Sequence, residues 1–195
     1  MATTKKTTTK VVKKTTTRRK SSSKKTTTKK AYADGLLVFK SKAMLDYHLQ
    51  LKELKKNGLI QDFEVPTIEE KTKNKHGAIK VMIDGHLFDS TVESKYYIYL
   101  LEQVAAGEVK SFSLQPAYEL IPRFQKKING KVKTFRKTEY IADFIVVDKN
   151  NEESIIDIKG QLTDVFKLKQ KLFEHTFPDK TLRLIKYERG QWKDI

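Results

Sequence analysis

Two short segments rich in β-branched residues place the strongest constraint on the fold of this chain. Residues 140–147 (YIADFIVV) and 154–159 (SIIDIK) are joined by the polar turn DKNNEE. Two such runs around a polar turn predict an antiparallel β-hairpin. The chain therefore contains at least one pair of neighbouring strands, and the other elements are predicted around it.

A helix and a further strand are predicted after this hairpin. Thr163 or Asp164 can cap a helix that runs to about Thr176 and that Pro178 stops. The helix carries Val165, Leu168 and Leu172 on one face. Residues 182–187 (LRLIKY) then predict a last strand.

Further helices and strands are predicted before the hairpin. Helical patterns cover residues 41–56 and 90–106, an extended run covers 109–121 with an interruption at Pro116, and residues 123–137 form a basic loop. From residue 90 the order is helix, strand, strand, strand, helix, strand. This order predicts an α/β sandwich with a central mixed sheet.

The two amino-terminal helical patterns repeat one another at an offset of 49 residues. The identical pairs are Phe39/Phe88, Ser41/Ser90, Tyr47/Tyr96, Leu51/Leu100, Glu53/Glu102, Gly58/Gly107 and Phe63/Phe112. This spacing indicates a duplicated helix–turn–strand unit, with the first copy packed on the second. A chance similarity between two amphipathic helices is the alternative.

The uneven distribution of charge along the sequence separates an amino-terminal segment from the rest of the chain. The whole chain carries 40 Lys plus Arg against 24 Asp plus Glu, and residues 1–30 hold 12 of these basic residues and no acid. We expect residues 1–30 to be a disordered basic tail that attracts phosphates, or only a solubilising tail. Residues 31–75 are interpreted as an accessory helix–strand module with a linker, and residues 76–195 as the main domain.

Composition excludes several classes of protein. The chain has no cysteine, so a disulfide scaffold, a thiolate zinc site and a cysteine nucleophile are excluded. No apolar run approaches the roughly 18 residues of a membrane span, and the amino terminus has no secretory signal pattern. We therefore expect a soluble, cytoplasmic protein with an anionic partner and no membrane association.

Two carboxylates converge in the predicted hairpin. If the turn centres on Asn150, Asp143 and Asp157 lie directly opposite each other, and a change of one residue in the loop leaves them diagonal neighbours. Asp157 and Lys159 are two residues apart, so their side chains leave the same face of the sheet. Ionised carboxylates in apolar strands need a compensating cation.

A magnesium ion is one such cation. Two carboxylates, a backbone carbonyl such as that of Ile158, and waters would suit Mg²⁺, with phosphate oxygens completing the octahedron. Lys159 would then orient or deprotonate a water, or stabilise charge on a phosphate. The alternative is a structural ion pair between Asp157 and Lys159.

Glu93 adds a third acid. On its helix the apolar face is marked by Tyr96, Tyr97 and Leu100, at spacings that carry Glu93 toward the sheet. Residues 90–93 (STVE) also form a capping-box pattern, so Glu93 could serve only the start of the helix. In the first repeat the matching residue is Met44.

These residues resemble the PD-(D/E)XK nuclease core. More closely, the stretch from about His76 to Tyr187 is similar to a family of small phage and prophage proteins assigned to that superfamily. The resemblance covers roughly 110 of 195 residues. It is carried by residues 84–90 (DGHLFDS), Glu93, Gln115-Pro116, 140–144 (YIADF), 157–160 (DIKG), Lys169, Lys171, Leu172 and Phe173. Asp157 stands where many relatives have Glu.

The resemblance implies a restriction-endonuclease-like αβββαβ core and Mg²⁺-dependent hydrolysis of phosphodiesters, with Mn²⁺ able to substitute. It implies Asp143 and Asp157 as metal ligands, Lys159 as the catalytic lysine, and Glu93 as a further metal or water contact. We expect a phage-type DNA endonuclease in the cytoplasm of a bacterial host, acting on duplex or branched DNA, with a homodimer as one way to cut both strands. The residues expected to bind the DNA backbone are Lys126, Lys127, Lys131, Lys133, Arg136, Lys137, Lys167, Lys169 and Lys171.

Two rival functions remain open. A catalytically inactive DNA-binding or assembly protein could use the same scaffold, because function must be argued from the site and not from the fold. A nucleoid-like or ribonucleoprotein component would rely mainly on the basic tail. Three acids beside a lysine favour catalysis over both.

Overall fold

The helices begin and end close to where the sequence predicts them. A computed structural model describes residues 32–67 and 79–195, and the predicted basic tail lies outside these residues. Within them the helices are α1 (Lys42–Lys56), α2 (Thr91–Ala105) and α3 (Asp164–Thr176). Each is capped by a hydroxyl that accepts a backbone N–H three residues later, from Ser41, Ser90 and Thr163.

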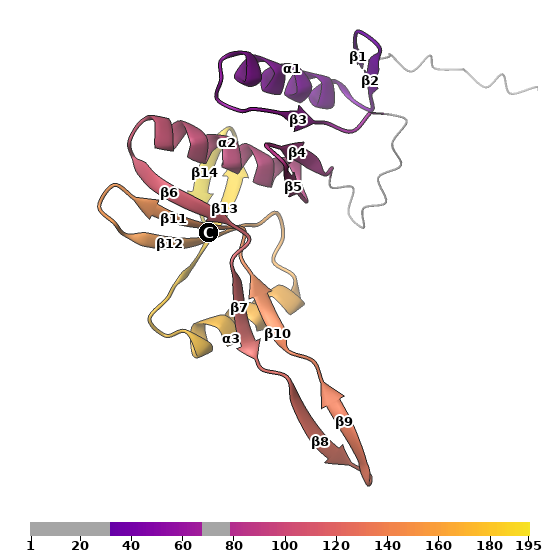
Figure 1. The fold of residues 1–195 in the computed structure, drawn as a ribbon, viewed down its shortest axis with the longest axis vertical. Coiled ribbons are helices and arrows are strands. Elements are labelled where there is room, and N and C mark those ends of the chain that lie inside the picture. The colour runs from indigo at the N-terminus through magenta and orange to yellow at the C-terminus, as the bar shows by residue number, and fades with distance from the viewer. Residues whose placement is uncertain (1–31, 68–78) are drawn as a thin grey trace, which may run out of the picture. The chain divides into compact units, whose positions relative to one another are not determined.

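A five-stranded mixed sheet lies at the centre of the described residues (Figure 1). Its order is β14 (Gln191–Asp194), β13 (Leu182–Glu188), β12 (Glu153–Ile158), β11 (Phe144–Asp148), β6 (Val109–Leu114). β12 and β13 are parallel, and the other neighbours are antiparallel. The predicted mixed α/β fold is confirmed at this level.

The two faces of this sheet pack against different helices. Phe144, Ile156 and Ile185 share a buried cluster with residues of α2. Ile155, Leu182 and Leu184 alternate with them along the strands and share a second cluster with residues of α3. Asp157 follows Ile155 by two residues, so it belongs to the α3 face of the sheet.

The predicted interruption of the run 109–121 at Pro116 is confirmed, and the segment 140–147, predicted as one strand, is also broken. The extended run 109–121 divides into β6 and β7 (Ala117–Ile121), and the segment 140–147 divides into β10 (Thr138–Ile141) and β11. β7 and β10 pair with each other outside the main sheet. The breaks lie side by side, because Gln115 N–H donates to Asp143 O and Ala142 N–H donates to Pro116 O.

The basic segment 123–137 is a second hairpin, so its prediction as a loop is wrong. β8 (Phe124–Ile128) pairs with β9 (Lys131–Phe135) in register. Asn129 and Gly130 connect them with φ values of 50° and 78°. Positive φ at both positions is typical of the two-residue turn that Asn-Gly favours.

The face of α3 marked by Val165 and Leu168 is largely exposed. These side chains are 68% and 60% exposed, and the helix instead buries Phe166 and Phe173. The aromatic rings have more apolar area to bury, and Tyr140 lies within reach of both rings. Leu172, the third aliphatic residue of the predicted face, is partly buried and packs against the same cluster as the two rings, so the prediction fails for Val165 and Leu168 only.

The two similar segments have matching local structure. β1 (Tyr32–Asp34), β2 (Leu37–Phe39) and α1 are followed 49 residues later by β4 (Val81–Ile83), β5 (His86–Phe88) and α2. β3 (Phe63–Glu64) pairs with β4 in a three-stranded sheet with β5. The hydroxyls of Tyr47 and Ser94 are 2.9 Å apart in the interior between α1 and α2, so the first unit shares a core with the second.

The described helices are too short and too polar to cross a bilayer.

Candidate active site

Asp143 and Asp157 meet where β11 and β12 pair. The register pairs Phe144 with Ile156, and Asp143 and Asp157 are the next residues along the two strands. The backbone N–H of Ile158 donates to Oδ2 of Asp143 over 2.6 Å. The predicted convergence of these two acids is therefore present in the structure.

Asp157 is only 1% exposed, and two neighbouring side chains contact its carboxylate. Its Oδ1 accepts the hydroxyl of Tyr140 over 2.8 Å. Its Oδ2 forms an ion pair with Nζ of Lys159 over 2.5 Å. Burial raises the pKa of Asp157, and the Lys159 ammonium opposes that rise.

Asp143 shows the larger pKa shift of the two. Burial raises its pKa to about 7, and the nearby Asp157 carboxylate adds to this effect. The hydrogen bond from Ile158 opposes the rise, and the charge of Glu93 increases it slightly. The charge on Asp143 is therefore poorly compensated by the surrounding protein.

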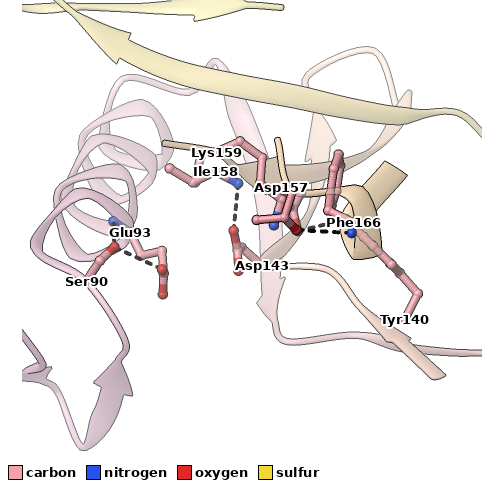
Figure 2. Close-up of polar contacts among 9 residues, drawn as sticks. Ser90, Glu93, Tyr140, Asp143, Asp157, Ile158, Lys159 and Phe166 are labelled. Carbon is pink, nitrogen blue, oxygen red and sulfur yellow. Dashed lines mark hydrogen bonds and ion pairs between the residues drawn. The ribbon is translucent and has the colours of Figure 1, made fainter. Parts of the chain in front are cut away.

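Glu93 lies at the start of α2 and takes part in its cap (Figure 2). Its Oε1 accepts the Ser90 hydroxyl over 2.9 Å, and its Oε2 accepts the Asp89 N–H over 3.2 Å. The capping contacts foreseen as an alternative role are thus formed. Burial nevertheless raises the pKa of Glu93, and the charge of Glu93 in turn raises the pKa of Asp143, so Glu93 interacts electrostatically with one acid of the sheet.

Two hollows open beside these acids. Glu93 and Asp143 line the first, together with His86, Gln115 and Phe144. Asp157 and Lys159 line the second, together with Tyr140, Phe166 and Lys169. Asp143 is therefore placed at the strand end between Glu93, on the α2 side, and Asp157, on the α3 side.

Because the acids line two separate hollows, they do not form one compact metal site. In residues 32–67 and 79–195, no group of three or more His, Cys, Asp and Glu side chains is arranged to hold a metal ion. The donors nevertheless suit Mg²⁺ in type, because they are hard carboxylate oxygens. The raised pKa values of Asp143 and Asp157 are features that a bound cation would relieve.

Lys159 forms an ion pair with Asp157, which is the structural role that the sequence allowed as an alternative to catalysis. Its ammonium also lies over the ring of Phe166, 4.6 Å from the centroid. Phe166 and Tyr140 complete the surroundings of Asp157, but sequence reasoning assigned neither a site role. Tyr140 belongs to a different ladder from Asp157, so no local pattern relates the two residues.

The predicted DNA-binding residues fall into two groups. Lys126, Lys127, Lys131 and Lys133 are exposed on β8 and β9, and Arg136 and Lys137 follow β9. Lys137 pairs with Glu139, Lys167 lies 3.6 Å from Asp164, and Lys169 donates to the backbone oxygen of Glu139. Lys171 is exposed on α3. The Asn129-Gly130 pair was the signal that could have identified the first group as a hairpin.

Comparison with known proteins relates the chain to one family. A family model described as "Protein of unknown function (DUF1064)" matches residues 73–189. No curated protein and no solved structure matches the chain. The matched segment contains α2, α3, the main-sheet strands from β6 to β13, and the three acids and the lysine of the candidate site.

Proposed function

We propose that this chain, which belongs to the DUF1064 family, is a Mg²⁺-dependent DNA endonuclease. The observation that carries the proposal is the buried pair of Asp143 and Asp157 at one strand end, with Lys159 in contact with Asp157. Burying two acids side by side raises their pKa values and costs stability. Such a cost is typical of a functional site.

The arrangement of elements supports a restriction-endonuclease-like core. α2, β6, β11, β12, α3 and β13 follow one another in the αβββαβ order, with the β7–β10 and β8–β9 ladders inserted between β6 and β11. β6, β11, β12 and β13 are successive neighbours in one sheet. The acids lie where β11 and β12 meet, between the two helices that cover the sheet.

The residues of the site would divide the work of phosphodiester hydrolysis. Asp143 and Asp157, with the carbonyl of Ile158, would hold Mg²⁺, and Mn²⁺ would substitute for it. When bound, the ion supplies positive charge that stabilises a phosphate under attack. Lys159 would orient the attacking water or stabilise phosphate charge, and Glu93 would accept a proton or hold a water from the α2 side.

The proposed substrate is duplex or branched DNA. The exposed lysines of β8 and β9 and Lys171 would neutralise backbone phosphates, which gives affinity without base specificity. A phage-type enzyme would act in the cytoplasm of a bacterial host. A homodimer would allow both strands to be cut.

A second function keeps the DNA binding and drops the catalysis. The Asp157–Lys159 ion pair favours it, because Lys159 already compensates the charge that a metal would otherwise balance. In that case the sheet would be only the scaffold of a DNA-binding or assembly protein.

Cleavage of labelled duplex, single-stranded, flap and four-way-junction DNA with Mg²⁺, Mn²⁺ or EDTA tests the proposal. We expect metal-dependent cutting by the parent chain and a loss of at least about 100-fold in Asp157→Asn and Asp143→Asn. Asp46→Asn is the matched control, because Asp46 is exposed on α1. Binding without cutting by the parent would replace the nuclease with the second function.

A further inference from the structure

The β8–β9 hairpin, called the arm below, is the most exposed pair of strands among the described residues. It consists of β8, the Asn129-Gly130 turn and β9, and every residue from Phe124 to Thr134 is exposed. Figure 1 shows the arm continuing beyond the β7–β10 ladder, away from the helices and the main sheet. The arm therefore contributes little to the buried core.

The charge on the arm is of one sign. Residues 123–137 contain seven Lys or Arg and no acid. Among the described residues, Lys137 is the only one of the seven that forms an ion pair, and its partner is Glu139. The four lysines within the arm itself form no ion pair with the described residues, so their charge is available to a partner outside the chain.

The register of the arm makes this charge costly. Lys126 lies directly opposite Lys133, and like charges directly opposite each other destabilise a ladder. Lys131 lies two pairs further toward the tip, opposite Ile128, and so on the same face of the ribbon. A row of closely spaced ammonium groups is unfavourable for the isolated arm but suits a row of phosphates.

Two aromatic residues at the base of the arm pack against each other across the ribbon. The rings of Phe124 and Phe135 stack with centroids 4.7 Å apart and an interplanar angle of 7°. The Lys133 ammonium lies 5.2 Å from the centroid of Phe135. These contacts restrain the base of the arm and the Lys133 side chain, which lowers the entropy lost when a partner binds.

We propose that the arm is a two-stranded ribbon that binds in the major groove of duplex DNA. The major groove, about 12 Å wide, admits a two-stranded ribbon, whose strands are about 4.8 Å apart. Five residues per strand span roughly 17 Å, enough to cross from one phosphate row to the other. The deep, narrow major groove of duplex RNA would not admit it.

This role goes beyond phosphodiester cleavage and does not depend on it. The arm would bind duplex DNA through the major groove, whereas the acids of the candidate site lie on the main sheet. Binding by the arm can therefore be measured with EDTA present, in the Asp157→Asn background, where no cleavage is expected. A failure of the nuclease proposal leaves this measurement unaffected.

The first test compares two triple variants of the full chain that lose the same charge. The arm variant carries Lys126→Gln, Lys131→Gln and Lys133→Gln, and the control carries Lys42→Gln, Lys56→Gln and Lys193→Gln at other exposed positions. We expect the arm variant to bind a 30-base-pair duplex at least about tenfold more weakly at 0.15 M salt, with a salt slope smaller by about 2 to 3. Equal weakening of both variants would overturn the proposal. Equal melting temperatures show that both remain folded.

The second test identifies the groove. Because the chain has no cysteine, Val132→Cys places a single photo-crosslinker near the tip, where Val132 is 67% exposed. We expect crosslinks to duplex DNA that a major-groove competitor such as methyl green suppresses and a minor-groove competitor such as netropsin does not. Crosslinks only to single strands or RNA, suppression by netropsin instead, or no crosslink at all would each overturn the proposal.

Discussion

Tyr140 donates its hydroxyl to Oδ1 of Asp157 over 2.8 Å, and both residues are buried. Tyr140 belongs to β10, which lies outside the main sheet, whereas Asp157 belongs to β12 within it. This bond therefore ties the side ladder of β7 and β10 to the candidate site. It also gives the buried carboxylate one of its few favourable contacts.

Removing this hydroxyl should destabilise the protein. In Tyr140→Phe the buried Oδ1 of Asp157 loses its donor, and we expect a loss of about 1 to 3 kcal/mol in the free energy of unfolding. Tyr118→Phe is the matched control, because Tyr118 lies opposite Tyr140 in the same ladder. Urea denaturation measures both variants. Equal losses in the two would contradict a specific role for the Tyr140 bond.

Stability should depend on pH through Asp143. Because the pKa of Asp143 is raised from 3.8 to about 7 in the folded protein, the folded state holds this proton more tightly than the unfolded state. This contribution is fully present below pH 3.8 and is lost as the pH rises through 7. Urea denaturation in EDTA across this range should show a downward trend that Asp143→Asn reduces. The same trend in Asp143→Asn as in Asp46→Asn would show that Asp143 is not its source.

Divalent metal should stabilise the folded chain through the same acids. At 100 times its Kd, a bound ion adds about 2.7 kcal/mol, which raises Tm by roughly 5 to 10 °C for a chain of this size. We expect Mg²⁺ and Mn²⁺ to raise the Tm of the parent and of Asp46→Asn, measured by calorimetry. Asp143→Asn and Asp157→Asn should respond weakly. An equal rise in all four proteins would place the ion elsewhere.

The two helix caps offer a matched comparison at the repeat positions Ser41 and Ser90. Both hydroxyls accept a backbone N–H, but only that of Ser90 also donates to a carboxylate, that of Glu93. We expect Ser41→Ala to lower the free energy of unfolding by about 1 kcal/mol. Ser90→Ala should lower it by more, because the bond to Glu93 is lost as well. Only Ser90→Ala should also alter DNA cleavage, since it releases Glu93. A change in cleavage of the same size in Ser41→Ala would mean that the effect is one of stability alone.

Much of the local structure could be predicted from residues close together in the sequence. The three helices begin after Ser41, Ser90 and Thr163, close to the predicted starts, because a cap joins residues three apart. The pairing of β11 with β12 was also predictable, since a short turn sets the register of a hairpin. The Asn129-Gly130 turn carried the same kind of signal, although the positive charge around it favoured the interpretation as a loop.

The candidate site was predictable only in part. Alternation along β12 places Asp157 and Lys159 on one face, as expected, and the hairpin register brings Asp143 beside Asp157. Glu93 was expected to join them, yet it faces a hollow on the other side of Asp143 from Asp157. Its distance from Asp157 depends on which face of the sheet α2 covers, and no short-range pattern contains that information.

The sequence by itself determined the helix ends, the hairpin around Asn150 and the set of acids and lysine that could carry chemistry, because each depends on contacts between neighbours in the chain. The tertiary structure alone decided where β7 and β10 leave the main sheet, which face of α3 is buried, and that Tyr140 is the partner of Asp157. These features follow from packing and hydrogen bonds between segments far apart in sequence, whose free energies depend on the assembled core.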